Sequence, residues 1–345
     1  MKNKIKYPKI LPLVTDNHCY VMSTGMSVPE NVVTNDDILS NYDIRATDRS
    51  IQFGLGAVER RWDNQGLNSS DLLFEVSMQC LEKANIAPDQ LDRIIYARLL
   101  GDDLVPKTSI RVMEKLRIKK GIPTIDIRAA CSGFIHALDM AIRYINAGES
   151  YVLVLAGGIA SRSANNSNKK DSKTIFLMGD GASGVLLGPS EKKHFFASYI
   201  YSDNSLYEEA YVPFGSQLLN GDRNFNNEIF NMNMQNGINI HNATIKSAYV
   251  VTQKLLETTN LTIDDVDAVV TSDQTKLIWE EQLKTINAPK EKSMSMFPSF
   301  GNTVSAMTPI NFHEMISTNK IKRGNTVLMM AHGAGASGGG LIFQY

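Results

Sequence analysis

The 345-residue chain contains an internal repeat, and this repeat constrains its fold more than any other feature. Three segments recur 175 positions later with a similar pattern of apolar, acidic and amide residues. One match could arise by chance, but three in a single register indicate two copies of one unit, far longer than the repeat of a solenoid. The matching segments are 81–82 with 256–257, 85–95 with 260–270, and 151–156 with 326–331.

Both copies predict the same order of helices and strands. Residues 72–84 and 245–258 have the apolar spacing of amphipathic helices, and a short Asp-rich turn and a buried strand follow each of them. The later runs 151–156 and 326–331 are apolar on both faces, which is typical of strands covered by helices on both sides. We therefore expect an α/β fold with the layers α/β/α/β/α and two pseudo-symmetric lobes. The predicted lobes are residues 1–189 and 190–345.

Composition and charge exclude several classes of protein. A net charge of −1 gives no overall attraction to nucleic acid or to a membrane surface. No apolar run approaches the roughly 20 residues that span a bilayer, and residues 10–14 are too short for the core of a signal peptide. Three cysteines, Cys19, Cys80 and Cys131, do not form a disulfide framework. We expect a cytoplasmic protein without a membrane span or a nucleic-acid partner.

Cys131 is the strongest candidate for a reactive side chain. The segment 124–141 (TIDIRAACSGFIHALDMA) predicts a strand, a turn at Cys131 and then a helix. Unpaired backbone N–H groups at a helix N-terminus favour anions, so we expect a lowered thiol pKa and a nucleophilic thiolate. The alternative is a buried structural cysteine, which is how we interpret Cys19 and Cys80. No His, Cys, Asp or Glu residues show metal-ligand spacing, so no metal is expected.

Five short motifs stand out along the chain. In chain order they are 58–61 (VERR), 129–134 (AACSGF), 176–184 (FLMGDGASG), 300–303 (FGNT) and 331–335 (AHGAG). Together they resemble the motifs of ketoacyl-acyl carrier protein synthase III, and the match spans roughly residues 20–345. This resemblance implies a thiolase-like duplicated fold, in agreement with the repeat. It also implies a homodimer that uses acyl-coenzyme A or acyl carrier protein thioesters as substrates, with no resident cofactor.

The resemblance also implies a mechanism in two stages. An acyl group moves from its carrier to Cys131, and a malonyl thioester then loses carbon dioxide and attacks the acyl-enzyme. The family uses a cysteine, a histidine and an asparagine, and Asn302 matches the asparagine. Backbone N–H groups of Cys131 and of Gly333 or its neighbour would form an oxyanion hole.

The sequence departs from the family at the histidine. The family has His-Gln-Ala-Asn where this chain has Asp273-Gln-Thr-Lys276, and an ionised aspartate cannot donate a hydrogen bond to an enolate. His332 stands where the family usually has phenylalanine, in the glycine loop that borders the nucleophile. We therefore predict that His332 takes over part of the missing role, oriented by Asp273. The alternative is that His332 only packs in that loop.

Two features bear on the acyl donor. Residues 50–54 (SIQFG) replace the tryptophan and arginine with which the family clamps coenzyme A, which favours a carrier protein or another donor. The basic run 111–120 could dock an acidic carrier protein, although a solvated helix end is the simpler interpretation.

We predict an acyltransferase that carries its acyl group on Cys131, with Asn302, His332 and Asp273 as further catalytic residues. The predicted reaction is condensation with a malonyl or other carrier-bound acceptor, in fatty-acid-like or secondary-metabolite biosynthesis. One alternative is a non-condensing acyltransferase to an oxygen or nitrogen acceptor, which the missing histidine favours. Another is a non-catalytic subunit of a heteromeric ketosynthase, which Cys131 and Asn302 count against.

Overall fold

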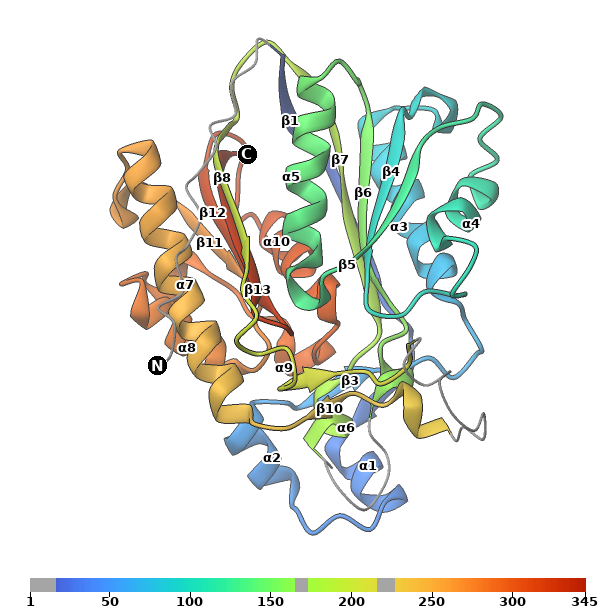
Figure 1. Cartoon of the computed structure of the whole chain (residues 1–345), viewed down its shortest axis with the longest axis vertical. Helices are drawn as coiled ribbons and strands as arrows, with labels where there is room; N and C mark the ends of the chain where they lie inside the picture. The colour runs from blue at the N-terminus through green and yellow to red at the C-terminus, as the bar shows by residue number, and fades with distance from the viewer. Residues whose placement is uncertain (1–16, 165–172, 216–226) are drawn as a thin grey trace.

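The computed structural model describes residues 17–164, 173–215 and 227–345. Residues 10–14, which are too short for the core of a signal peptide, lie outside these ranges. Figure 1 shows two β-sheets that enclose a central pair of helices, with further helices covering the outer face of each sheet. The predicted α/β/α/β/α layering is confirmed.

The N-terminal sheet has five strands in the order β1-β7-β6-β4-β5. β4 is parallel to both β5 and β6, whereas β7 is antiparallel to β6 and β1. Two helices, α3 (Ser69–Ala84) and α4 (Thr108–Lys115), cover its outer face. The strands are β1 (His18–Ser27), β4 (Arg93–Arg98), β5 (Thr124–Arg128), β6 (Val152–Gly158) and β7 (Gly181–Ser190).

The C-terminal sheet has four strands in the order β11-β12-β13-β8. Its outer face packs on α7 (Gly237–Thr259) and α8 (Lys276–Thr285). The strands are β8 (Phe195–Ser202), β11 (Ala268–Thr271), β12 (Thr326–Gly333) and β13 (Ser337–Gln344). The chain passes from the first sheet to the second between residues 190 and 195, next to the predicted lobe boundary. That the two lobes are separate domains stays a prediction.

The internal repeat is visible in the structure. The order β8-β13-β12-β11 reproduces β1-β7-β6-β4, and only β5 lacks a counterpart in the second sheet. α3 and α7 both end at an asparagine in the left-handed conformation, Asn85 (φ 55°) and Asn260 (φ 54°). Asparagine tolerates this conformation better than most side chains, which explains why it recurs 175 positions apart.

The central layer consists of α5 (Gly133–Asn146) and α10 (Met307–Ser317). The large apolar side chains on the buried face of α5 are each 2% exposed or less, and burying each of them contributes about 1.5–3 kcal/mol. A short 3₁₀ turn precedes each helix, residues 130–132 before α5 and 304–306 before α10. Ala130 (φ 45°) and Val304 (φ 57°) hold the same strained conformation in the two turns, which lie against each other. The buried residues of α5 are Phe134, Leu138, Ala141, Ile142 and Ile145.

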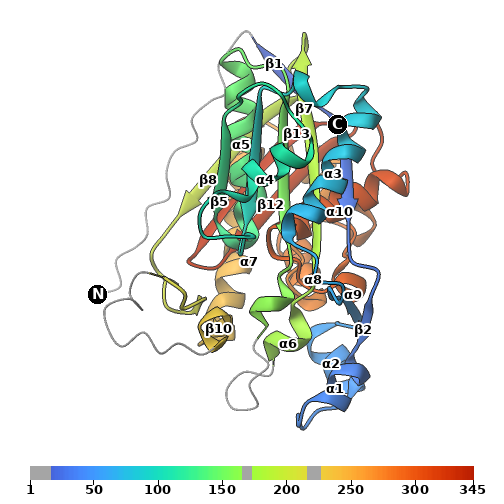
Figure 2. The same ribbon diagram turned by 90° about the vertical axis from the view of Figure 1, so that its right-hand side faces the viewer.

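Small elements form one end of the molecule, where α1, α2 and α6 lie together below the sheets (Figure 2). Arg60 is fully buried there and ties them together. Its guanidinium donates to Asn35 Oδ1 (2.7 Å) and to the carbonyls of Phe176 (2.8 Å) and Val33 (3.2 Å). The elements are α1 (Asn35–Asn41), α2 (Asp48–Leu55), α6 (Lys173–Leu177), α9 (Phe297–Phe300), the ribbon of β2 (Val32–Thr34) with β3 (Glu59–Arg61), and the ribbon of β9 (Ala210–Tyr211) with β10 (Asn233–Met234).

Candidate active site

Cys131 lies in the turn between β5 and α5, where the sequence predicted it. The residue before it, Ala130, has a positive φ of 45°, a conformation that costs roughly 1–3 kcal/mol for a residue with a side chain. Strain of this kind persists only where the surrounding structure enforces it. The turn of Cys131 packs against α5 and against the turn before α10, and these contacts fix its conformation.

The expected lowering of the Cys131 pKa is wrong. Burial raises the pKa of this thiol to about 12, while hydrogen bonds from its own backbone N–H and from the side chain of Asn302 act in the opposite direction. Although part of Cys131 reaches solvent, the residue packs in an apolar cluster with Met178, Met232 and Val304. Desolvation by these side chains outweighs the favourable field of the helix N-terminus. The thiol of Cys131 is therefore neutral at neutral pH.

Asn302 contacts Cys131, as the resemblance implied. It follows α9 and Gly301, whose φ of 67° suits a glycine, and its backbone N–H donates to the carbonyl of Leu177 (2.6 Å). Asn302 Oδ1 accepts from the N–H of Val304 (2.8 Å). Because the oxygen is occupied in this way, the amide Nδ2 is the group left to donate toward sulfur or a thioester oxygen.

Gly333 packs directly on the nucleophile turn. A β-carbon placed on Gly333 would lie 3.0 Å from the backbone nitrogens of Cys131 and Ser132 and 3.0 Å from the carbonyl oxygen of Ala129. Only glycine allows the backbone to approach this closely without displacing the turn. Gly333, the last residue of β12, therefore packs against the backbone N–H of Cys131, the group that the resemblance assigns to an oxyanion hole.

Asp273 is buried just after β11 and has its own set of donors. Its Oδ2 accepts from the hydroxyl of Ser295 (2.6 Å) and from the backbone N–H of Phe297 (2.9 Å). Burial raises its pKa to about 6, while these bonds and one from the side chain of Asn311 act in the opposite direction. At neutral pH the carboxyl is mainly ionised, so it cannot supply the hydrogen bond that a histidine would donate.

The predicted role of His332 conflicts with where its side chain lies. Along β12, Ala331 faces the central helices, whereas Met330 faces α7, so His332 also falls on the α7 side. Its Nδ1 lies 3.1 Å from Thr244 Oγ1 on α7, and burial lowers its pKa to about 4. His332 and Asp273 bind different partners, so the prediction that Asp273 orients His332 is wrong. The structure does not bring the imidazole together with Cys131.

An apolar pocket next to the site was missed by the sequence reasoning. It lies between the ends of β4 and β6 and the turn before α10, and three of its lining residues, Leu99, Ala160 and Val304, belong to the cluster that surrounds Cys131. Three segments far apart in the chain meet there, and only the fold brings them together. The lining residues are Leu99, Leu100, 157–160 and 303–305.

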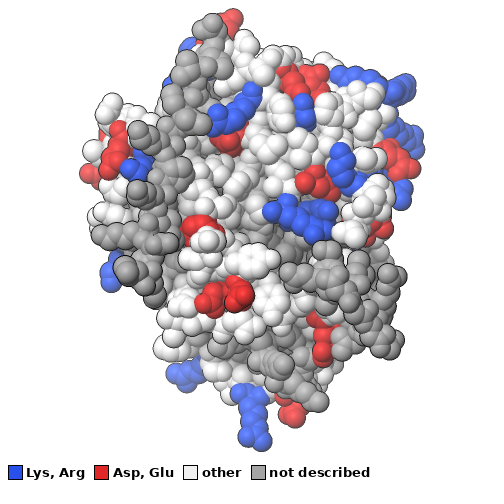
Figure 3. Space-filling model, viewed as in Figure 1, with Lys and Arg blue, Asp and Glu red and all other residues white. Residues whose placement is uncertain are grey.

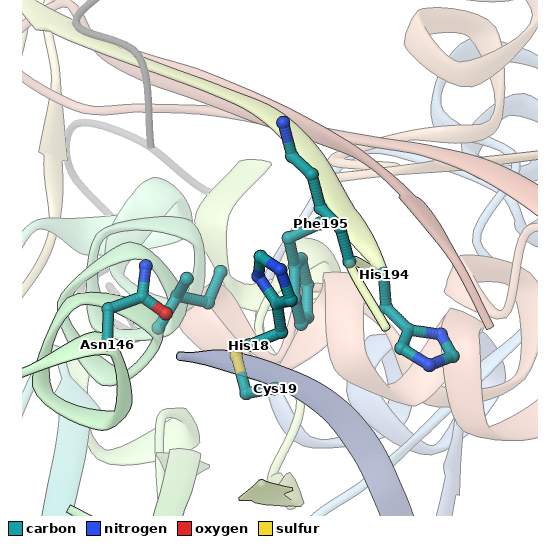
Figure 4. A pocket seen from close by; sticks show the side chains of 7 residues that line it. His18, Cys19, Asn146, His194 and Phe195 are labelled. Atoms are coloured by element: carbon teal, nitrogen blue, oxygen red, sulfur yellow. The ribbon is translucent and has the colours of Figure 1, made fainter. Parts of the chain in front are cut away.

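A second pocket lies at the opposite end of α5 and is separate from this site. Figure 4 shows His18, Cys19 and Asn146 around it, with the side chain of His194 directed away. Asn146 is the last residue of α5, and the 14 residues of this helix span roughly 20 Å, so the pocket is remote from Cys131. Cys19 is buried, and burial raises its pKa to about 12.

Most of the positive charges in the basic run 111–120 are paired with acidic side chains. Arg111 pairs with Glu114, Lys115 with Asp71 and Lys120 with Asp92, so three of its five positive charges have acidic partners. Acidic and basic residues are interspersed on the face shown in Figure 3. Among the residues that the structure describes, none form a His/Cys/Asp/Glu group able to hold a metal ion, and no helix is long and apolar enough to cross a bilayer.

The chain matches two profiles for the family, "3-Oxoacyl-[acyl-carrier-protein (ACP)] synthase III" over residues 125–204 and its C-terminal part over residues 256–345. It is 31% identical to the beta-ketoacyl-[acyl-carrier-protein] synthase III of Aquifex aeolicus over 94% of this chain and 99% of the relative. The relative of the same description from Methylococcus capsulatus is 32% identical over 94% and 98%.

Solved structures give the same result. The crystal structure of the Aquifex aeolicus 3-oxoacyl-[acyl-carrier-protein] synthase III superposes with a TM-score of 0.86 at 30% identity, covering 95% of this chain and all of that one. The priming β-ketosynthase of the R1128 polyketide pathway has a TM-score of 0.86 at 21% identity, covering 99% and 98%, which shows a shared fold. The chain therefore belongs to the 3-oxoacyl-[acyl-carrier-protein] synthase III family of thiolase-like, acyl-transferring condensing enzymes.

Proposed function

We propose that Cys131 accepts an acyl group from a thioester of coenzyme A or of an acyl carrier protein. The observation that carries this proposal is the contact between the thiol and Asn302 in a turn that Gly333 approaches closely. The sulfur attacks the thioester carbon, the carbon–sulfur bond to the carrier breaks, and the proton of the Cys131 thiol leaves on the carrier thiol. Backbone N–H groups of the turn stabilise the oxyanion that forms between these steps.

In the second stage we propose that a malonyl or other carrier-bound thioester is the acceptor. It loses carbon dioxide, and its enolate carbon attacks the acyl group on Cys131, whose sulfur then leaves and takes up a proton. Asn302 Nδ2 is the donor available to the enolate oxygen. This stage places the enzyme in a pathway that lengthens acyl chains, either of fatty acids or of secondary metabolites.

Asp273 favours a second candidate function, non-condensing transfer of the acyl group to an oxygen or nitrogen acceptor. An ionised carboxylate in place of the family histidine repels an enolate but can accept a proton from an alcohol or an amine. Such an acceptor needs no decarboxylation. The two functions therefore differ in one product, carbon dioxide.

Mass spectrometry of intact and digested protein after incubation with acyl thioesters tests the first stage. We expect an adduct on the peptide that contains Cys131 and its loss in Cys131→Ala. The peptides of Cys19 and Cys80 are internal controls, because both thiols are buried whereas part of Cys131 reaches solvent. No adduct with any donor would contradict the proposal and favour a non-catalytic subunit. Release of labelled carbon dioxide from a malonyl thioester then separates condensation from simple transfer.

We also propose a homodimer that works in the cytoplasm. β5 forms the edge of the N-terminal sheet, and the nearby Leu104 and Val105 are 61% and 83% exposed, which suits a covered interface. The three cysteines are free, as expected in a reducing compartment. Light scattering after size-exclusion chromatography tests the dimer, and a mass of one chain at micromolar concentration would refute it.

A further inference from the structure

A chain of polar side chains joins the nucleophile helix to the glycine hairpin of the other lobe. Ser132 and His136 are four residues apart at the start of α5, so they share one face of the helix. That face meets Ser337, the first residue of β13.

The hydrogen bonds in this chain have a defined order. Ser132 Oγ donates to the carbonyl of Ala129 (2.8 Å) and lies 3.1 Å from Ser337 Oγ, which in turn lies 2.9 Å from His136 Nε2. Ser132 Oγ can donate its single proton to the carbonyl of Ala129 or to Ser337 Oγ, and Ser202 Oγ lies 3.4 Å from Ser337 Oγ as a further donor. The network connects His136 to the turn of Cys131, and the hydrogen bonds in such a network strengthen one another.

Ser337 is the other end of the hairpin that carries Gly333. The two residues pair across β12 and β13, and Gly333 is the residue that packs on the backbone nitrogen of Cys131. Any displacement of Ser337 therefore moves Gly333 relative to Cys131. The turn of Cys131 comes from the N-terminal lobe and the hairpin from the C-terminal lobe, so contacts between lobes must hold the two together.

We propose that His136 is a positioning residue that, through Ser337, fixes the Gly333–Ser337 hairpin against the turn of Cys131 and so sets the geometry of the oxyanion hole. The proposal rests on the function proposed above for Cys131. It predicts that His136 affects the step in which negative charge forms on the thioester oxygen, and that it does not affect the intrinsic reactivity of the thiol.

The test compares two reactions of the full-length protein. The first is the single-turnover transfer of an octanoyl or acetyl group from coenzyme A to Cys131, followed by mass spectrometry, which needs the oxyanion hole. The second is alkylation of the same thiol by iodoacetamide, which does not. The variants are His136→Phe, His136→Gln, which keeps an N–H near the position of Nε2, and Ser337→Ala. His313→Phe is the matched control, because it removes another partly buried imidazole, which lies on α10 and bonds Thr24 of β1.

We expect His136→Phe and Ser337→Ala to slow acyl transfer on the order of 10-fold to 100-fold, the effect of a small misplacement, with alkylation unchanged. His136→Gln should restore most of the rate, and the His136→Phe, Ser337→Ala double variant should be no slower than either single variant. The control should match the unaltered protein.

Acyl transfer at the unaltered rate in both His136→Phe and Ser337→Ala would overturn the proposal. So would an equal loss of alkylation and acyl transfer, because that pattern indicates a general disturbance of the turn. If the unaltered protein takes up iodoacetamide at Cys131 but no acyl group from any thioester, the proposed function itself fails, and with it this inference. Ser337→Ala keeps the test decisive if His136→Phe does not fold.

Discussion

Replacing Asp273 by asparagine should stabilise the protein at neutral pH, although it removes a charged group from the candidate active site. The carboxyl is 1% exposed, and its pKa is set by burial and by hydrogen bonds from neutral groups. Asparagine has nearly the same shape, and its side-chain oxygen can accept from Ser295 and from the N–H of Phe297. The substitution therefore removes the cost of burying a charge while it keeps two of the hydrogen bonds.

The size of the effect follows from the pKa of Asp273, which burial raises from 3.8 to about 6. The folded state holds the proton more tightly than the unfolded state, so this group stabilises the fold at low pH. That stability is lost as the pH rises through about 6. A shift of about two pH units corresponds to about 3 kcal/mol. The free energy of unfolding of Asp273→Asn minus that of the unaltered protein should thus rise by about 2–3 kcal/mol between pH 4 and pH 8.

Urea denaturation at a fixed protein concentration, at several pH values in this range, measures the difference. Asp180 is also buried and has a pKa raised to about 6, so Asp180→Asn is a control in the other lobe with the same expected pH profile. Taking the difference between the two free energies of unfolding removes the pH dependence of all titratable groups that the two proteins share. A difference for Asp273→Asn that stays constant from pH 4 to pH 8 would refute the reasoning.

Three further predictions follow from single contacts. Arg60→Met leaves two buried oxygens and one partly buried oxygen without their donor and should lower the free energy of unfolding by about 3–5 kcal/mol in urea denaturation; a loss under 1 kcal/mol would contradict this. His332→Phe should leave the rate of Cys131 acylation unchanged, because the imidazole faces α7, and a clear loss of rate would return His332 to the site. Gly333→Ala should slow acylation on the order of 10-fold or more by pushing on the turn, whereas an unchanged rate would show that the turn can yield.

Local patterns were sufficient to predict the fold and the turn of the nucleophile. The repeat predicted the two equivalent sheets, and the change from alternating to helical spacing after Arg128 located Cys131 at a helix start. Asn302 was linked to Cys131 only through the family resemblance, since the two residues are 171 positions apart and no local pattern connects them.

The errors have identifiable physical causes. The run 327–331 is apolar at every position, so the sequence alone does not reveal which face of β12 His332 occupies. The pKa of Cys131 was predicted from the helix N-terminus alone, whereas Met178 and Met232, which desolvate the thiol, come from distant segments. The four-residue spacing of Ser132 and His136 places both on one face of a helix, which the sequence alone can predict. Their common partner Ser337 is about 200 positions away and is brought to them only by the fold.

The turn before α10 has a consequence for engineering. Ser305 occupies there the place that Cys131 holds in the first repeat, yet its hydroxyl donates to the carbonyl of Ala97 (2.8 Å) and accepts from the N–H of Gly157 (3.1 Å). The second half of the chain thus completes the interior of the first. The two halves are consequently not interchangeable. In a chimera that combines halves from two relatives, the second half must supply a hydroxyl at the position of Ser305, or the hydrogen bonds that join β4 and β6 through this side chain are lost.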